Sequence, residues 1–256
     1  MSAEKNSIKV IDRDTIKYIA AVPMIIGHFV SAFIEHGLLE SNTLWTVLTA
    51  LSCFAPPVFF FSISDGYLYT RSKKQYALRL LVFAVITQVP FILLHYGTDF
   101  TLSDLRNLNV FFTLFAGLVA IIIWESKAKL SLRIAGVILI DLITFALECE
   151  WMIFGVPIIL GLHIFRESPK KRFIFFAVCA VTMQYISWGM SIYILLSPGF
   201  ITGTLSMLAS YFFRTAFYSG KKGNHPVFAK WFFYIIYPLH LAVEYIIVLI
   251  YQLKRY

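Results

Sequence analysis

The stretch FAPPVFFFSISDGYLYTRSKKQYALRLLVFAVITQVP, residues 54–90, decides the fold. An apolar run ends at Ser64-Asp65-Gly66-Tyr67, basic residues follow, and a second apolar run then begins. Each run approaches the ~20 residues that a helix needs to cross the ~30 Å hydrocarbon core of a bilayer. The stretch therefore predicts two membrane-spanning helices joined by a short, aromatic, basic loop. We call residues 64–79 the elbow.

The composition of the whole chain extends this prediction. The chain has 256 residues, 59% of them apolar and only 14% charged, and its mean hydropathy is +0.76. A soluble domain carries about 25% charged residues, so a soluble protein of this composition could not cover its surface. We predict one integral-membrane domain over residues 1–256, an all-α polytopic transmembrane helix bundle. About nine spans (eight to ten) are expected, near residues 15–34, 44–64, 76–96, 107–124, 130–147, 151–165, 172–188, 190–212 and 232–253.

The distribution of positive charge in the chain indicates a membrane protein rather than a nucleic-acid-binding protein. The net charge is +8, but the basic residues lie between the apolar runs, as the positive-inside rule requires. With a cytoplasmic N-terminus, only Arg106, Lys254 and Arg255 of the 22 Lys and Arg residues fall outside. We therefore expect no nucleic-acid partner and a multi-pass protein with its N-terminus in the cytoplasm. The three cysteines form no CxxC pair and predict no metal site or disulfide.

Polar side chains recur at one depth of the predicted spans. Counting about 1.5 Å per residue places six of them near mid-membrane, on five helices. An ionisable group there costs roughly 2.5–3.5 kcal/mol on insertion scales and usually faces the bundle interior. On the last span, Tyr237, His240 and Glu244 share one helical face. The six residues are His28, Gln88, Asp141, Gln184, His240 and Glu244.

We take His28, His240, Glu244 and Asp141 as the candidate catalytic residues. Each also has a structural interpretation. His28 could bond a neighbouring helix, His240 and Glu244 could form an interhelical pair, and Asp141 could be a neutral hydrogen bonder. A metal site of His28, His240 and Glu244 is possible in ligand type, but no HExxH-like pattern supports it, and we predict no metal. The other histidines lie near helix ends or in loops and are expected to be ordinary interfacial residues: His36, His95, His163 and His225.

The elbow combines a turn, rings and positive charge. Gly66 would permit a sharp turn at the end of the helix. Tyr67 and Tyr69 offer flat faces for a ring, or anchor the loop at the membrane interface. The loop suits a phosphate-rich molecule such as coenzyme A, although it could also be a topology determinant only. The basic residues suited to phosphate groups are Arg71, Lys73, Lys74 and Arg79.

Four blocks of residues carry a resemblance to a known family. They are Lys17-Tyr18 with Met24 and His28, the stretch PPVFFFSISDGYLYTRSKKQYALRLLVFAVITQVPF at 56–91, LNVFFTLFAGL at 108–118, and FFYIIYPLHL at 232–241. The chain resembles the TraX family of membrane acetyltransferases, known for acetylating the N-terminus of conjugative pilin. His28 is similar in position to the reacting histidine of the type-3 acyltransferases. One departure is Glu150-Trp151-Met152, where many relatives carry Asp-Tyr-Gly before a Gly-Val pair.

The resemblance implies an acetyltransferase of the bacterial inner (cytoplasmic) membrane. Its donor substrate would be cytosolic acetyl-CoA. Its acceptor, a protein N-terminus, an envelope glycan or a small molecule, would enter from the other side. His28 would be the general base, Glu244 or Asp141 would fix a histidine tautomer, and Asn109, Gln88 or Tyr237 would donate to the oxyanion. Membrane lipid is the other partner. The residues expected at acetyl-CoA are Asp65, Tyr67, Tyr69, Arg71, Lys73, Arg79 and Asn109.

Two other functions remain open from the sequence. A layer of His, Asp and Glu at mid-membrane is also typical of a proton-coupled transporter. The absence of a detectable repeat argues against a transporter, and a transporter does not require the elbow. A structural membrane scaffold would leave the polar layer unexplained.

Overall fold

The structure, a computed structural model, describes residues 10–221 and 223–254. Over these residues the regular secondary structure is helical, apart from one isolated parallel bridge between Ile11 and Tyr218. The prediction of an all-α helix bundle is confirmed. The α-helices are α1 (Arg13–Glu35), α2 (Thr43–Leu51), α3 (Ala55–Tyr69), α4 (Lys73–Tyr96), α5 (Val110–Trp124), α6 (Leu130–Ala146), α7 (Met152–Ile164), α8 (Pro169–Ser187), α9 (Pro198–Ala216) and α10 (Pro226–Leu253). Short 3₁₀ helices are η1 (Ser52–Phe54), η2 (Asp104–Arg106) and η3 (Ile192–Leu196).

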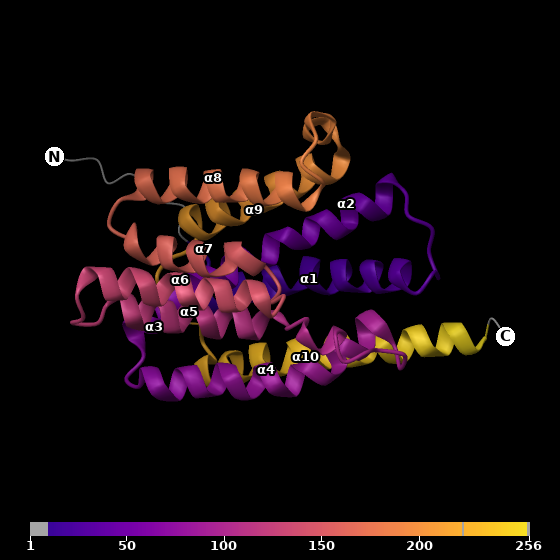
Figure 1. Ribbon diagram of the computed structural model, residues 1–256, viewed down its shortest axis with the longest axis horizontal. Helices are drawn as coiled ribbons and strands as arrows, with labels where there is room; N and C mark the ends of the chain where they lie inside the picture. Colours follow the sequence, from indigo (N-terminus) through magenta and orange to yellow (C-terminus); the bar gives the residue numbers. More distant parts are fainter. Residues whose placement is uncertain (1–9, 222, 255–256) are drawn as a thin grey trace.

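The helices lie roughly along the long axis of the molecule, with the end of α10 and the α3–α4 connection at opposite ends of the bundle (Figure 1). Four helical stretches are long and apolar enough to cross a membrane: Arg13–Glu35, Thr43–Tyr69, Lys73–Tyr96 and Val227–Leu253. Each predicted span contains a helix, although α9 begins only at Pro198, after η3. The chain is therefore a membrane helix bundle, close to the expected nine spans.

The second span is a bent run made of α2, η1 and α3. Pro56 and Pro57 lie in the first turn of α3, where a proline is tolerated because the first N–H groups of a helix lack partners. The bend brings Ser52 against Gly27 of α1, so closely that a Cβ on Gly27 would lie 2.2 Å from the Ser52 Cβ. Small residues at such crossings let membrane helices approach one another.

The elbow is shorter than predicted. Helix α3 does not end at Ser64-Asp65-Gly66-Tyr67 but continues to Tyr69, and α4 begins at Lys73, where the side chain of Ser72 caps its N-terminus. The predicted turn at Gly66 is therefore wrong. Gly66 is helical, and its missing side chain makes room for the Tyr76 ring, which a Cβ would meet at 2.6 Å.

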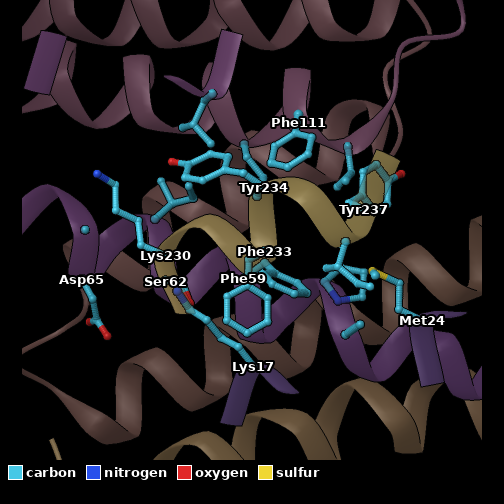
Figure 2. A pocket seen from close by; sticks show the side chains of 18 of the residues that line it. Lys17, Met24, Phe59, Ser62, Asp65, Phe111, Lys230, Phe233, Tyr234 and Tyr237 are labelled. Atoms are coloured by element: carbon cyan, nitrogen blue, oxygen red, sulfur yellow. The ribbon is translucent and has the colours of Figure 1, made fainter. Parts of the chain in front are cut away.

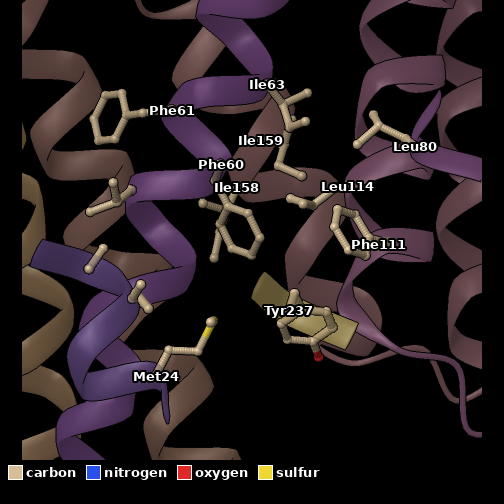
Figure 3. Close-up of a cluster of buried hydrophobic side chains, with 14 of the residues drawn as sticks. Met24, Phe60, Phe61, Ile63, Leu80, Phe111, Leu114, Ile158, Ile159 and Tyr237 are labelled. Carbon is tan, nitrogen blue, oxygen red and sulfur yellow. The ribbon is translucent and has the colours of Figure 1, made fainter. Parts of the chain in front are cut away.

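The core surrounds α3 (Figure 3). Helix α3 packs against α1, α5, α7 and α9. Phe60 and Ile63 of α3 are buried against side chains of α5 and α7, including Leu118 and Ile158. This central position fixes α3 and presents its remaining face to the site described below.

The outer surfaces of the long helices are apolar. Val85, Ile86 and Val89 of α4 and Leu239 and Val243 of α10 are each about half exposed or more. Exposed aliphatic rows on helices with internally bonded backbones are what a hydrocarbon environment requires. These faces are lipid-facing.

Contacts connect the basic segments at one end of the bundle, which we call the elbow end. Arg214 at the end of α9 forms an ion pair with Asp65 of α3. Residue Ile11 bonds the α9–α10 loop through Phe217 and Ser219. The opposite end carries the contact of His36 with Gln252. Four residues included in the charge count, Lys5, Lys9, Lys222 and Arg255, lie outside the described residues.

The contact between Gly66 and Tyr76 is testable. Gly66→Ala would force a Cβ into the Tyr76 ring, and overpacking of this kind costs about 1–3 kcal/mol. We expect a lower unfolding midpoint in detergent micelles, and partial recovery when Tyr76→Ala is added. Equal stability of the single variant and the wild type would contradict this role of Gly66.

Candidate active site

A cavity of about 500 Å³ runs from the elbow end toward the middle of the bundle. Side chains of α1, α3, α4, α5 and α10 line it, together with the α6–α7 loop and the α9–α10 loop. Figure 2 shows Asp65 and Lys230 at one end and Met24 and Tyr237 at the other. The middle is apolar and largely aromatic, with Phe59, Leu80, Phe111, Leu114 and Phe233.

The mouth at the elbow end is cationic. Lys17, Arg79 and Lys230 line it, and among the described residues no carboxylate lies within ion-pair distance of any of them. Lys17 Nζ lies 5.2 Å from the centre of the Phe233 ring. The Nε atom of Arg79 is buried and has no hydrogen-bond partner in the described part of the chain. Unpaired cations at a cavity mouth are suited to an anion such as a phosphate group.

The two carboxylates at this mouth are already paired with arginines. Arg13 Nε donates to Asp14 at 3.1 Å, and Arg214 donates to Asp65. Arg214 also lies 3.6 Å from the centre of the Tyr218 ring. Asp65 is therefore held by Arg214 of α9 and forms no ion pair with Lys17, Arg79 or Lys230.

His28 lies at the deep end of the cavity. Its ring centre is 5.3 Å from that of His240, 5.9 Å from that of Tyr237 and 6.3 Å from that of His95. No hydrogen bond to another described residue holds the His28 ring. A histidine that faces a cavity with free ring nitrogens has the geometry of a general base.

Glu150 forms the other polar wall of the deep end. Its Oε2 accepts hydrogen bonds from the Val110 N–H at 2.6 Å and from the Tyr237 hydroxyl at 2.7 Å. Its backbone carbonyl accepts from Thr113, and its N–H donates to the Leu108 carbonyl. The carboxylate is thus fixed to the first turn of α5 and to α10.

The loop that carries Glu150 is strained. Glu148, Trp151 and Met152 have φ values of 46°, 71° and 29°, a region that residues with a side chain rarely adopt. Such conformations cost of order 1–3 kcal/mol each and persist where surrounding contacts impose them. Small residues would favour this backbone conformation. In this chain the turn therefore adopts it although Trp151 and Met152 occupy it.

Comparison with known proteins identifies the family. Residues 12–248 match the TraX protein family. The chain belongs to the TraX family. It is also 27% identical to the probable fimbrial assembly protein FimC, serogroup H1, of Dichelobacter nodosus, over 89% of this chain and 92% of that protein. No solved structure matches the chain.

The cavity of this TraX-family protein includes only some of the residues predicted to contact acetyl-CoA. Asp65, Tyr69 and Arg79 line it. Arg71 and Lys73 are exposed outside it, and Lys73 lies over the ring of Tyr67, 5.0 Å from its centre. Tyr67 in turn packs on His163. The positive charge at the mouth therefore comes from Arg79 together with Lys17 and Lys230.

Asn109 and Gln88 have structural roles. The Asn109 amide donates to the Ala84 carbonyl and to Gln88 Oε1, each at 2.8 Å, while its oxygen caps α5 at the Phe111 N–H. Gln88 Nε2 donates to the Asn107 carbonyl at 2.6 Å. These donors join α4 to the start of α5, so neither amide is directed at an oxyanion beside His28.

The remaining polar residues of the predicted layer are dispersed. Asp141 lies on α6 away from the cavity, and one of its oxygens is buried without a partner in the described residues. Gln184 of α8 accepts a hydrogen bond from the indole N–H of Trp188, the residue that follows this helix. Among the described residues neither Glu244 nor Asp141 forms a hydrogen bond with a histidine, so the predicted tautomer-fixing role is wrong for both. His240 is instead fixed by its own helix, through Nδ1 and the Ile236 carbonyl at 2.9 Å.

The sequence interpretation underestimated four residues. Lys17, Met24 and His28 are spaced at 7 and 4 residues on α1, and that periodicity places Lys17 on the face of His28. On α10, Lys230 precedes Phe233 by three residues and Tyr237 by seven, so helical periodicity places it on the face of these two rings. Glu150 lines the site, whereas the sequence marks it only as part of the departure Glu150-Trp151-Met152. His95 reaches His28 through a tertiary contact for which the sequence carries no comparable signal.

The ion pair between Asp65 and Arg214 should be structural. Asp65→Asn would leave a largely buried guanidinium without its carboxylate, which typically costs about 3–5 kcal/mol. We expect a lower unfolding midpoint in micelles, and recovery in the double variant Asp65→Asn with Arg214→Met. A stable Asp65→Asn protein would contradict the importance of this pair.

Proposed function

We propose that this protein is a membrane acyltransferase that transfers an acetyl group from acetyl-CoA, bound at the elbow end, to an acceptor beside His28. The single observation that carries the proposal is the cavity, because it joins a cationic mouth to an unbonded histidine. We place the elbow end in the cytoplasm, where acetyl-CoA is available, and the protein in the bacterial inner membrane.

The parts of acetyl-CoA, the proposed donor, match the two regions of the cavity, its cationic mouth and its aromatic middle. The phosphates and adenine of acetyl-CoA would stay at the mouth, near Lys17, Arg79 and Lys230. The pantetheine arm is thin and nearly neutral, and it would pass the aromatic middle between Phe59 and Phe233. Tyr69 is exposed at the rim, where its ring could stack on the adenine.

His28 would act as general base. As the acceptor nitrogen or oxygen attacks the thioester carbonyl, its proton passes to His28, the new C–N or C–O bond forms, and the C–S bond breaks. His28 then returns the proton to the leaving thiolate, which departs as coenzyme A. A neutral imidazole with an unbonded ring nitrogen can accept a proton from the acceptor and release it to the leaving group.

The acceptor is proposed to be an amine of an envelope protein, by analogy with the relative named as a fimbrial assembly protein. Pilin N-terminal acetylation is what membership of the family implies. Glu150 fits this class of acceptor, because a carboxylate at the deep end is complementary to an ammonium group. A glycan or small-molecule hydroxyl is the alternative, and mass spectrometry of acetylated envelope material distinguishes them.

Donor binding tests the first step. We expect wild-type protein in micelles to bind coenzyme A, and the double variant Lys17→Ala with Arg79→Ala to bind at least about 100-fold more weakly, because each charged contact contributes about 1.5–3 kcal/mol. The matched control is Arg71→Ala with Lys74→Ala, two exposed cations of the elbow, and it should bind nearly as well as the wild type. No affinity of the wild type at millimolar coenzyme A would overturn the proposal and favour a transporter.

Replacement of His28 tests the chemistry. His28→Ala should lower the rate of acetyl transfer to a peptide amine by about 10²–10⁴-fold, the usual contribution of a general base, while the affinity for coenzyme A stays nearly unchanged. Calorimetry and a single-turnover transfer assay measure the two quantities. Equal loss of binding and transfer would make His28 a structural residue.

A further inference from the structure

A second histidine connects the deep end of the cavity with the opposite end of the bundle. His95 is on α4, and its ring lies edge-on to His28 with 6.3 Å between the ring centres. Its Nδ1 lies 2.7 Å from Oε2 of Glu35, at the end of α1. Neither residue lines the cavity. The Glu35 side chain is 42% exposed, whereas the His95 side chain is 20% exposed.

We infer that His95 and Glu35 form a proton relay that carries a proton from His28 to the end of the bundle opposite the elbow. The inference rests on the proposed function. We call this pair the His95–Glu35 relay. Its members are positioning residues, because they act through His28 and touch neither donor nor acceptor.

The bond to Glu35 sets the tautomer of His95. A carboxylate accepts, so Nδ1 of His95 carries a hydrogen and Nε2 has a free lone pair. A ring separation of 6.3 Å is a distance that one water molecule can bridge between ring nitrogens. His95 can then accept a proton at Nε2 while it gives its Nδ1 proton to Glu35.

The alternative route through His240 leads to a buried carboxyl group rather than to water. His240 is nearer to His28, at 5.3 Å, but its Nδ1 is bound to the carbonyl of Ile236 in its own helix. The carboxyl group one turn further on, Glu244, is 3% exposed, and its two oxygens have no partner among the described residues. A proton that moved in this direction would stay inside the bundle, whereas Glu35 can release it to water.

The other titratable groups around His95 do not compete for its Nδ1 proton. Glu150 interacts with it electrostatically from the α6–α7 loop, but Oε2 of Glu150 is bound to Val110 and Tyr237. Tyr96 is its neighbour on α4, at 6.5 Å between ring centres. His36 bonds the Leu94 carbonyl at 2.6 Å. Beyond His28, α10 presents the rings of Tyr237 and His240.

Transfer to an amine releases one proton that has to leave the site, and the relay offers it a route. An acceptor that arrives as an ammonium ion yields an amide, coenzyme A thiol and one extra proton. His28 first takes a proton from the ammonium group and passes it through the relay, and the free amine then attacks the thioester carbonyl. The second amine proton goes through His28 to the thiolate sulfur as the C–S bond breaks. One proton therefore leaves by Glu35 in each turnover.

The experiment uses the full chain in nanodiscs, with acetyl-CoA and a peptide amine. We expect Glu35→Gln and His95→Ala to lower the transfer rate at least about tenfold in dilute buffer, while coenzyme A affinity stays at the wild-type value. The variant rates should rise with buffer concentration, and imidazole should restore the rate of His95→Ala. His36→Gln, at the same end of the bundle, is the matched control and should behave like the wild type.

Two results would overturn the inference while the proposed function stands: wild-type rates in both variants, or rates that are reduced equally at every buffer and imidazole concentration. The second result would assign the pair a structural role. If the wild-type protein neither binds coenzyme A nor transfers acetyl groups, the proposed function itself fails and the relay fails with it.

Discussion

Backbone N–H groups in the first turn of a helix must find partners within the protein when that turn lies inside hydrocarbon. The short helices of this bundle begin there, so this constraint applies to them directly. Helix α5 has 15 residues and α7 has 13, which correspond to about 22 Å and 20 Å of a core that is ~30 Å thick. The first turn of α5 is satisfied by Asn109, which caps Phe111, and by Glu150, which accepts from Val110. An unsatisfied group there would cost several kcal/mol.

This requirement also shapes the site. The carboxylate that completes the first turn of α5 is the same one that receives the Tyr237 hydroxyl from α10. Tyr237 then stands edge-on to His28. One side chain thus fixes the start of a helix, the rotation of the last helix and the wall beside the histidine, which accounts for the tolerance of left-handed backbone at Trp151 and Met152.

The sequence predicted those features that a single helix determines. The long spans are recognised by the length of their apolar runs, and the face shared by Tyr237, His240 and Glu244 follows from helical periodicity. The sequence therefore predicts the architecture. His28 was also found, because an ionisable residue inside an apolar run is conspicuous.

The predictions that differ from the structure all concern contacts between helices. Gly66 could be interpreted as a turn because nothing in the sequence shows that Tyr76 packs against it. Depth along a helix placed Asp141 and His28 at one level, but depth says nothing about the direction in which a side chain points around the bundle axis. The sequence predicts an interfacial role for His95, because nothing in it shows the contacts with His28 and Glu35 that join α4 to α1.

The charge of the cavity mouth depends on which residues form ion pairs as well as on how many acidic and basic residues line it. Asp14 and Asp65 both line the mouth, and if both were free they would neutralise two of the nearby cations. Each is instead occupied by an arginine, Arg13 and Arg214, so that Lys17, Arg79 and Lys230 keep an unbalanced charge. The aromatic middle keeps water scarce, and in such surroundings a charge acts over a longer distance than it would in water. This distribution of charge supports the proposal of an anionic headgroup at the rim and a thin, neutral chain in the passage to His28.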